Sequence, residues 1–191
     1  MQMSREIMLT IPGQATARAY LALPPSGTGP ALLVLHPWWG LNDDIRGFCD
    51  NLAAEGFVAL APDCFAGQVA TTIDAANHLV QTADDAACMR IVSVALDELL
   101  HLDAVSSAVA GVVGFSFGAH FSLATAGSRP DDIDAVVIYY GTSDADLSAA
   151  RARFLGHFAE DDPYEDAGWV QQVEATIRAT GNPVTFHTYP N

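Results

Sequence analysis

The chain alternates short apolar runs with longer stretches in which apolar and polar residues are mixed. Four runs are almost wholly apolar, which is typical of strands buried on both faces: 31–35, 57–61, 108–113 and 135–140. Between them, apolar residues recur three and four positions apart, which predicts helices at 43–55, 73–81, 86–102, 119–126 and 168–180. Further strands are expected at 7–11, 16–23, 153–158 and 184–189, the first two joined as a hairpin through Pro12-Gly13.

Buried strands that alternate with helices predict a mostly parallel central sheet with helices on both faces. The predicted fold class is therefore α/β with three layers. The chain of 191 residues has no internal repeat and no low-complexity segment. We expect it to form a single domain over residues 1–191.

Composition narrows the class of protein further. Half of the residues are apolar, but no segment has the length and uniformity of a membrane span. Residues 1–6 lack the basic-then-apolar pattern of a secretion signal, so we expect a cytoplasmic protein. An odd number of cysteines without a C-x-x-C pair argues against a disulfide framework or a structural zinc site: Cys49, Cys64 and Cys88.

The formal net charge of −15 disfavours nucleic acid and anionic membranes as partners, because phosphate contacts need clustered cations. All eight basic residues are arginines. Without a lysine, the chain can form neither a P-loop nor a Schiff base with pyridoxal phosphate. Nothing in the sequence indicates an oligomeric state.

The candidate chemistry centres on residues 114–118, which read Gly-Phe-Ser-Phe-Gly between the strand at 108–113 and the helix at 119–126. This is the context of a nucleophile elbow. Ser116 is expected to turn sharply with a strained backbone, so that its hydroxyl stands clear of the sheet. Gly114 and Gly118 are expected to keep β-carbons out of the close approach of strand and helix. We therefore predict that Ser116 is a catalytic nucleophile, and not part of an ordinary glycine-rich turn.

A serine nucleophile needs a base and a group that orients this base, and both gather beyond the carboxyl ends of the strands. The acidic run at 160–163 follows the strand at 153–158. Asp162 is predicted to be the orienting carboxylate, because Pro163 begins a turn that can hold its side chain inward. A solvated acidic loop is the non-catalytic interpretation. The alternative carboxylates are two neighbours in the loop and one residue after the preceding strand: Glu160, Asp161 and Asp144.

No histidine stands where the base is expected, after the last strand. His187 lies inside the strand at 184–189 and is expected to point into a layer that covers the sheet. His120 lies one helical turn after Ser116 on a helix that leaves the site, which argues against direct hydrogen-bond reach. Two further histidines are expected on helix surfaces: His78 and His101.

Metal chemistry is not indicated. His157 precedes the acidic loop and could bind a metal together with Asp161 or Asp162. Two or three such residues, without a further ligand at a recognisable spacing, do not indicate a metal site. We predict neither a metal nor a cofactor.

An oxyanion hole needs two backbone N–H groups that point to the developing negative charge. Phe117 supplies one as the residue after the nucleophile. Pro37 has no N–H, so Trp38, the next residue in the loop after the strand at 31–35, is predicted to be the second donor. Trp38 and Trp39 are also predicted to form an apolar wall of a substrate pocket, with simple packing as the alternative.

Four stretches resemble the dienelactone hydrolase family of the α/β-hydrolase fold, and the resemblance runs through nearly the whole chain. They are residues 33–42, 52–63, 114–118 and 157–163. The second, a helix end and a strand followed by Pro62-Asp63, is the most specific to the family. The resemblance implies hydrolysis of a lactone or small carboxylic ester by a nucleophile, an aspartate and a histidine, without metal or cofactor.

The chain departs from the best-known members of that family at three places. They have a cysteine where Ser116 stands, and a glutamate near that cysteine where Pro37 stands. Their base lies in a Gly-His turn that follows a Tyr-Pro pair near the last strand. This sequence ends with Tyr189-Pro190-Asn191. We therefore expect the catalytic histidine beyond Asn191, in a longer chain.

The leading interpretation is a serine-dependent hydrolase of a small-molecule lactone or ester, with Arg46 and Arg90 as candidates to anchor a substrate carboxylate. A generic carboxylesterase or thioesterase is the alternative within the same class. A non-catalytic protein that binds a small ligand on this fold is the alternative from another class. Catalysis by Cys64 lacks an elbow, and a buried structural thiol is the simpler interpretation.

Overall fold

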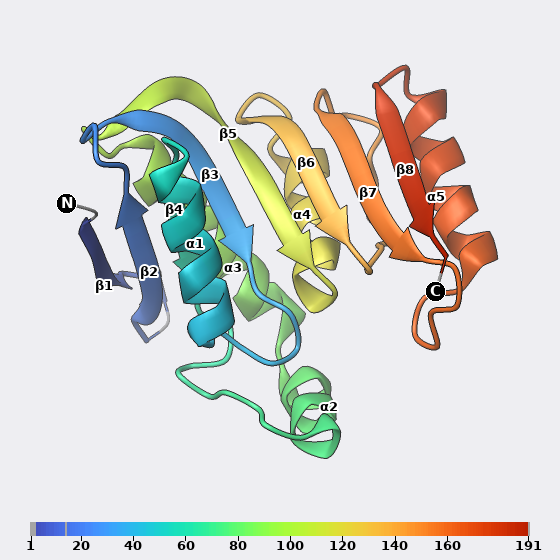
Figure 1. Ribbon diagram of the computed structural model, residues 1–191, viewed down its shortest axis with the longest axis horizontal. Helices are drawn as coiled ribbons and strands as arrows, with labels where there is room; N and C mark the ends of the chain where they lie inside the picture. The colour runs from blue at the N-terminus through green and yellow to red at the C-terminus, as the bar shows by residue number, and fades with distance from the viewer. Residues whose placement is uncertain (1–2, 14, 191) are drawn as a thin grey trace.

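One eight-stranded sheet runs through the computed structural model, which describes residues 3–13 and 15–190 (Figure 1). The strand order is β1-β2-β4-β3-β5-β6-β7-β8. The bounds are β1 Met3–Leu9, β2 Ala17–Leu23, β3 Gly29–Leu35, β4 Val58–Pro62, β5 Val105–Phe115, β6 Ile133–Tyr139, β7 Arg153–Ala159 and β8 Val184–Tyr189. β1 and β2 form the predicted antiparallel hairpin, β2 is antiparallel to β4, and the strands from β4 across to β8 are parallel. The mostly parallel sheet is thus confirmed. Two regions used in the sequence analysis lie outside the described residues: residues 1–2 and Asn191.

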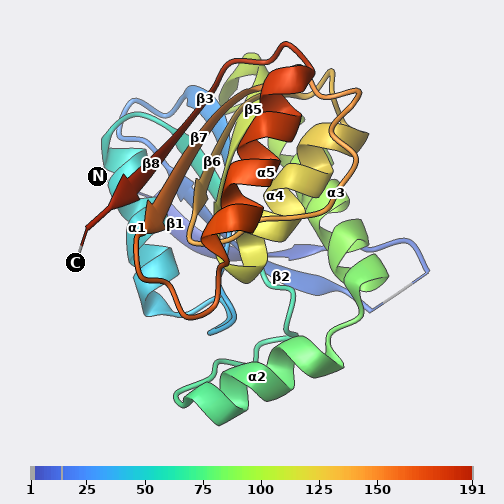
Figure 2. The same cartoon turned by 90° about the vertical axis from the view of Figure 1, so that its right-hand side faces the viewer.

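Helices lie on both faces of the sheet, which confirms the three-layer α/β architecture (Figures 1 and 2). α1 packs against β2 and β4 on one face, whereas α3, α4 and α5 lie on the other. α2 extends away from the sheet, beyond the carboxyl ends of the parallel strands. The bounds are α1 Asp43–Ala54, α2 Ile73–Thr82, α3 Asp85–Leu100, α4 Phe117–Ser128 and α5 Ala167–Ala179. None of these described helices has the length and apolar character needed to cross a bilayer.

The helix starts follow ordinary capping chemistry with one exception. At four helices a side-chain oxygen accepts the backbone N–H three residues further on: Asn42, Thr72, Asp84 and Asp166. α4 differs, because its N-cap residue Ser116 makes no such hydrogen bond. The partly positive N-terminus of α4 is therefore left without a side-chain cap at the edge of the sheet.

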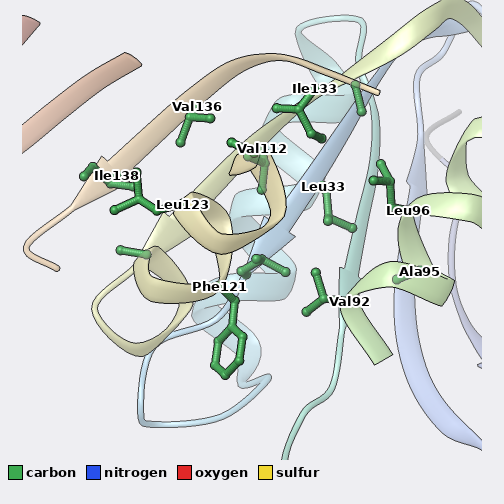
Figure 3. Close-up of a cluster of buried hydrophobic side chains, with 14 of the residues drawn as sticks. Leu33, Val92, Ala95, Leu96, Val112, Phe121, Leu123, Ile133, Val136 and Ile138 are labelled. Carbon is green, nitrogen blue, oxygen red and sulfur yellow. The ribbon is translucent and has the colours of Figure 1, made fainter. Parts of the chain in front are cut away.

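An apolar layer fixes α4 against the sheet (Figure 3). Its fully buried side chains come from β3, β5, β6, α3 and α4, and include Leu33, Val92, Leu96, Val112, Phe121, Leu123 and Ile138. Burial of each such side chain away from water adds about 1.5–3 kcal/mol to the free energy of unfolding. The layer therefore holds the start of α4, and Ser116 with it, in a fixed position.

The face that carries α1 is open over the second half of the sheet. Among the described helices none covers β7 and β8 on this side. Phe115, Tyr139, His157 and His187 stand at paired positions of β5 to β8 there. Their rings stack in sequence, with centroid distances of 5.0, 4.7 and 5.7 Å. The prediction that His187 points into a covering layer is wrong: its side chain is exposed at the end of this stack.

Candidate active site

The turn between β5 and α4 has the strained geometry that the G-x-S-x-G motif predicts. Ser116 has φ 48° and ψ −114°, and such a positive φ is costly for a residue other than glycine. β5 ends at Phe115 and α4 begins at Phe117, so Ser116 alone forms the corner. The turn projects this one residue beyond the edge of the sheet.

Three glycines allow the chain to pass closely around this corner. A β-carbon on Gly114 would lie 2.2 Å from Ser122 Oγ, and one on Gly118 would lie 2.2 Å from the carbonyl oxygen of Leu35. The expectation that these two glycines permit a close approach is therefore confirmed. A third glycine, Gly141, completes the arrangement, because its β-carbon would lie 2.5 Å from the carbonyl oxygen of Ser116.

A cavity of about 600 Å³ opens at this corner of the molecule. The five residues predicted from the sequence to form the site all border it: Ser116, Phe117, Trp38, Trp39 and Asp162. Six further residues complete its wall: Ile73, Asn77, Val80, Tyr140, Tyr164 and Glu165. The structure thus brings together groups from the loops after β3, β5, β6 and β7 and from α2. The chemical roles of the five remain predictions.

The two backbone N–H groups predicted for the oxyanion hole belong to adjoining segments. The ring of His36, which precedes Pro37 and Trp38, stacks on Phe117 with centroids 6.0 Å apart. Neither Trp38 nor Phe117 donates its backbone N–H to another residue within the described chain. Both residues border the cavity, and their N–H groups stay the predicted oxyanion donors.

Asp162 is held by the loop that follows β7. Its Oδ1 atom accepts the backbone N–H groups of Tyr164 and Glu165, the two residues after Pro163, at 2.8 and 3.3 Å. Its side chain is partly buried and borders the cavity. The three alternative carboxylates are exposed and do not border it: Glu160, Asp161 and Asp144. The geometry therefore favours Asp162 among the four acids that the sequence offered.

The described structure joins no histidine ring to Ser116 by a hydrogen bond. His120 Nδ1 lies 2.9 Å from Ser143 Oγ, and His157 Nδ1 lies 2.8 Å from the Tyr189 hydroxyl. His78 and His101 are exposed on α2 and at the end of α3, as expected. No group of three histidine, cysteine or acidic side chains in the described chain is arranged to hold a metal ion.

His36 is a buried connector beneath the site. Its Nε2 atom accepts the backbone N–H of Cys64 at 3.1 Å, and its Nδ1 atom lies 2.8 Å from the carbonyl oxygen of Pro37. Since that carbonyl can only accept, Nδ1 carries the proton and the ring is neutral. Burial lowers the pKa of His36 below its ordinary value. The ring therefore ties the loop that carries Trp38 to the loop after β4.

Cys64 has the environment of a structural thiol. A hydrogen bond with the Cys88 thiol, followed by burial, raises the pKa of Cys64 well above its ordinary value. The nucleophilic form of cysteine is the thiolate, which this environment disfavours. Cys64 also does not border the cavity at Ser116. Its interpretation as a structural residue fits this position better than catalysis.

The wall that α2 contributes was not predicted from the sequence. Ile73, Asn77 and Val80 lie four and three positions apart and all border the cavity. This spacing places the three side chains on one face of a helix, and it is the sequence feature that could have indicated this wall. Ile73 and Val80 are 52% and 37% exposed, so α2 presents apolar surface to the cavity.

The backbone of Tyr140 was also missed. The predicted strand at 135–140 ends one residue earlier, and Tyr140 takes a positive φ of 39° directly before Gly141. Tyr140 is 43% exposed and borders the cavity. Nothing in a run of apolar residues distinguishes this turn from one more strand position.

Comparison with known proteins agrees with this architecture. The model of the dienelactone hydrolase family matches residues 17–191. The chain is 38% identical over 130 residues to the protein usf of Aquifex pyrophilus, a match that covers 65% of this chain and 56% of that protein. It is 35% identical over 132 residues to an Aquifex aeolicus protein whose name proposes a carboxymethylenebutenolidase, with the same two coverages. The chain thus spans just over half the length of these two relatives.

Solved structures show the same fold. A dienelactone hydrolase-like promiscuous phosphotriesterase from metagenomic libraries superposes with a TM-score of 0.88 and 22% sequence identity. The superposition covers 100% of this chain and 82% of the other. At this level of identity the likeness supports the fold alone.

Proposed function

This chain belongs to the dienelactone hydrolase family, and we propose that it hydrolyses a lactone or small carboxylic ester with Ser116 as the nucleophile. The observation that carries the proposal is the position of Ser116. It stands at a strained corner on the wall of a cavity that Asp162 also borders. Strain of this kind persists where the surrounding structure holds it in place, and it clusters at active sites.

In the proposed reaction the Ser116 hydroxyl oxygen attacks the carbonyl carbon of the bound ester while a base takes up the hydroxyl proton. The N–H groups of Phe117 and Trp38 bind the oxygen that becomes negative. The alcohol then leaves with a proton from the protonated base, and an acyl group remains on Ser116. Water, activated by the same base, releases the acid and restores the serine. Asp162 orients the base and stabilises its protonated form.

The proposal is tested with a fluorophosphonate, which forms a stable adduct only with an activated serine. Intact mass is measured for the wild-type protein and for Ser116→Ala, with and without added imidazole as an external base. An adduct on the wild type and none on the variant supports the proposal. A requirement for imidazole would show that Ser116 is reactive but draws its base from solution. No adduct under either condition contradicts the proposal, and leaves a ligand-binding protein as the better interpretation.

A further inference from the structure

The charged side chains on the wall of the cavity are both acidic. Asp162 and Glu165 border it. None of the eight arginines does, although all eight lie within the described residues. The chain contains no lysine. Within the described part of the chain, a carboxylate on a substrate would therefore meet two acidic side chains and no arginine.

The two arginines considered for anchoring a substrate carboxylate are not at the cavity. Arg46 forms ion pairs with Glu6 at 2.9 Å and with Asp43 at 3.3 Å. Arg90 lies on the surface of α3 and does not border the cavity either. The formal net charge of −15 adds a field of the same sign around the whole molecule.

Glu165 is fixed in this wall. Its Oε2 atom accepts the Thr142 hydroxyl at 2.8 Å, which links the loop after β7 to the loop after β6. The side chain is partly buried. A charge held at the boundary of a partly desolvated cavity acts more strongly on a ligand than the same charge in water.

The rest of the wall is largely aromatic and apolar. Trp38 meets Trp39 and Tyr164 edge to face, each with ring centroids 5.4 Å apart. Ile73 and Val80 of α2 add exposed apolar surface on the same cavity. Such a wall is suited to an aromatic or branched apolar group of a ligand.

We propose that this cavity selects uncharged esters that carry an aromatic or branched apolar group, and that Glu165 excludes esters that bear a carboxylate. Glu165 is then a specificity-determining residue and not a catalytic one. The inference rests on the proposed esterase function of Ser116. It differs from that function in naming the charge of the substrate.

The test compares two esters of similar shape. 4-Acetoxybenzamide carries a neutral amide where 4-acetoxybenzoate carries a carboxylate. Each kcat/KM is divided by the rate constant of spontaneous alkaline hydrolysis to remove differences in leaving group. The wild type is expected to prefer the amide by about tenfold. In Glu165→Gln, which keeps an acceptor for Thr142, the preference should shrink about fivefold. Equal or better turnover of the benzoate by the wild type would overturn the proposal.

A matched variant separates the local charge from the overall charge. Glu55→Gln changes the net charge by the same amount at the exposed C-cap residue of α1, which does not border the cavity. It is expected to leave the preference within about 1.5-fold of the wild type. A shift equal to that of Glu165→Gln would remove the specific role of Glu165.

Calorimetric binding of both esters to Ser116→Ala keeps this inference distinct from the proposed function. Tighter binding of the amide, together with no turnover by the wild type, would support selection by charge and contradict the esterase proposal. Equal binding of both esters would contradict selection by charge, whatever the turnover.

Discussion

A β-carbon on Gly118 would lie 2.2 Å from the carbonyl oxygen of Leu35. The first turn of α4 therefore meets the end of β3 at a distance that only glycine permits. This contact sets the position of Phe117, on α4, relative to the loop that carries Trp38. The two proposed oxyanion donors thus owe their proximity to a residue without a side chain.

Gly118→Ala is expected to lower the free energy of unfolding by about 3 kcal/mol, because backbone cannot yield as a flexible side chain does. The matched control is Gly47→Ala in α1, where a β-carbon would meet nothing within 4 Å. That change should raise the free energy of unfolding by up to about 1 kcal/mol through helix propensity. Urea titration of both variants measures the difference. Two variants of equal stability would show that α4 can shift freely away from β3.

The strain at Ser116 can be measured with two substitutions at this one position. Both Ser116→Gly and Ser116→Ala remove the hydroxyl, but only glycine adopts φ 48° at no steric cost. We expect the glycine variant to be more stable than the alanine variant by about 1 kcal/mol, after its larger loss of backbone entropy is included. Urea unfolding curves with equal slopes give the comparison. A more stable alanine variant would mean that the corner is not strained.

Asp162→Asn tests the proposed orienting carboxylate. Asparagine keeps an oxygen for the N–H groups of Tyr164 and Glu165, so the free energy of unfolding should change by less than about 1 kcal/mol. If the triad is as proposed, kcat/KM should fall by about 10³-fold or more. Asp161→Asn, at an exposed neighbour that does not border the cavity, is the control and should stay within about twofold of wild type. Similar losses in the two variants would contradict the assignment.

The stability of the fold is expected to depend on His36 below neutral pH. Burial lowers the pKa of His36 in the folded state, whereas the unfolded chain has the ordinary value of about 6.5. Below pH 6.5 the unfolded state binds more protons, so the free energy of unfolding falls as the pH falls toward the folded-state pKa. The contribution of His36 is fully present above pH 6.5 and is lost in that lower window.

His36→Gln removes this titration. The variant should be less stable than wild type at pH 7.5, because one of the two hydrogen bonds is lost, but its stability should fall less steeply between pH 6.5 and 5. Urea unfolding at pH 7.5, 6.5, 5.7 and 5.0 measures both slopes. Parallel slopes for wild type and variant would show that the ring is already charged in the folded protein.

Most of the fold follows from local pattern. The apolar run before Ser116 and the helical run after it predict β5 and α4, and each of the other expected elements is present with its ends shifted by one to a few residues. The position of Asp162 on the same cavity as Ser116 follows from a general rule, since the carboxyl ends of parallel strands share one edge of the sheet.

Contacts between distant segments are what the sequence could not show. Alternation places His187 on one face of β8, but only the positions of the helices decide whether anything covers that face. Gly141 is indispensable at the elbow because another strand brings it against Ser116. The contribution of α2 to the cavity likewise depends on the path of the loops around it, which periodicity within α2 does not reveal.

The tryptophan pair has a practical consequence for spectroscopy. Trp38 and Trp39 border the cavity, and they are two of the three tryptophans in the chain. The third, Trp169, packs from α5 against the apolar core. Intrinsic emission is therefore weighted toward the cavity wall, and a ligand that displaces water from it should shift the emission maximum to shorter wavelength. Trp169→Phe would remove the emission that does not come from the cavity wall. The fluorescence of Trp38 and Trp39 would then report ligand binding in the cavity without an attached dye.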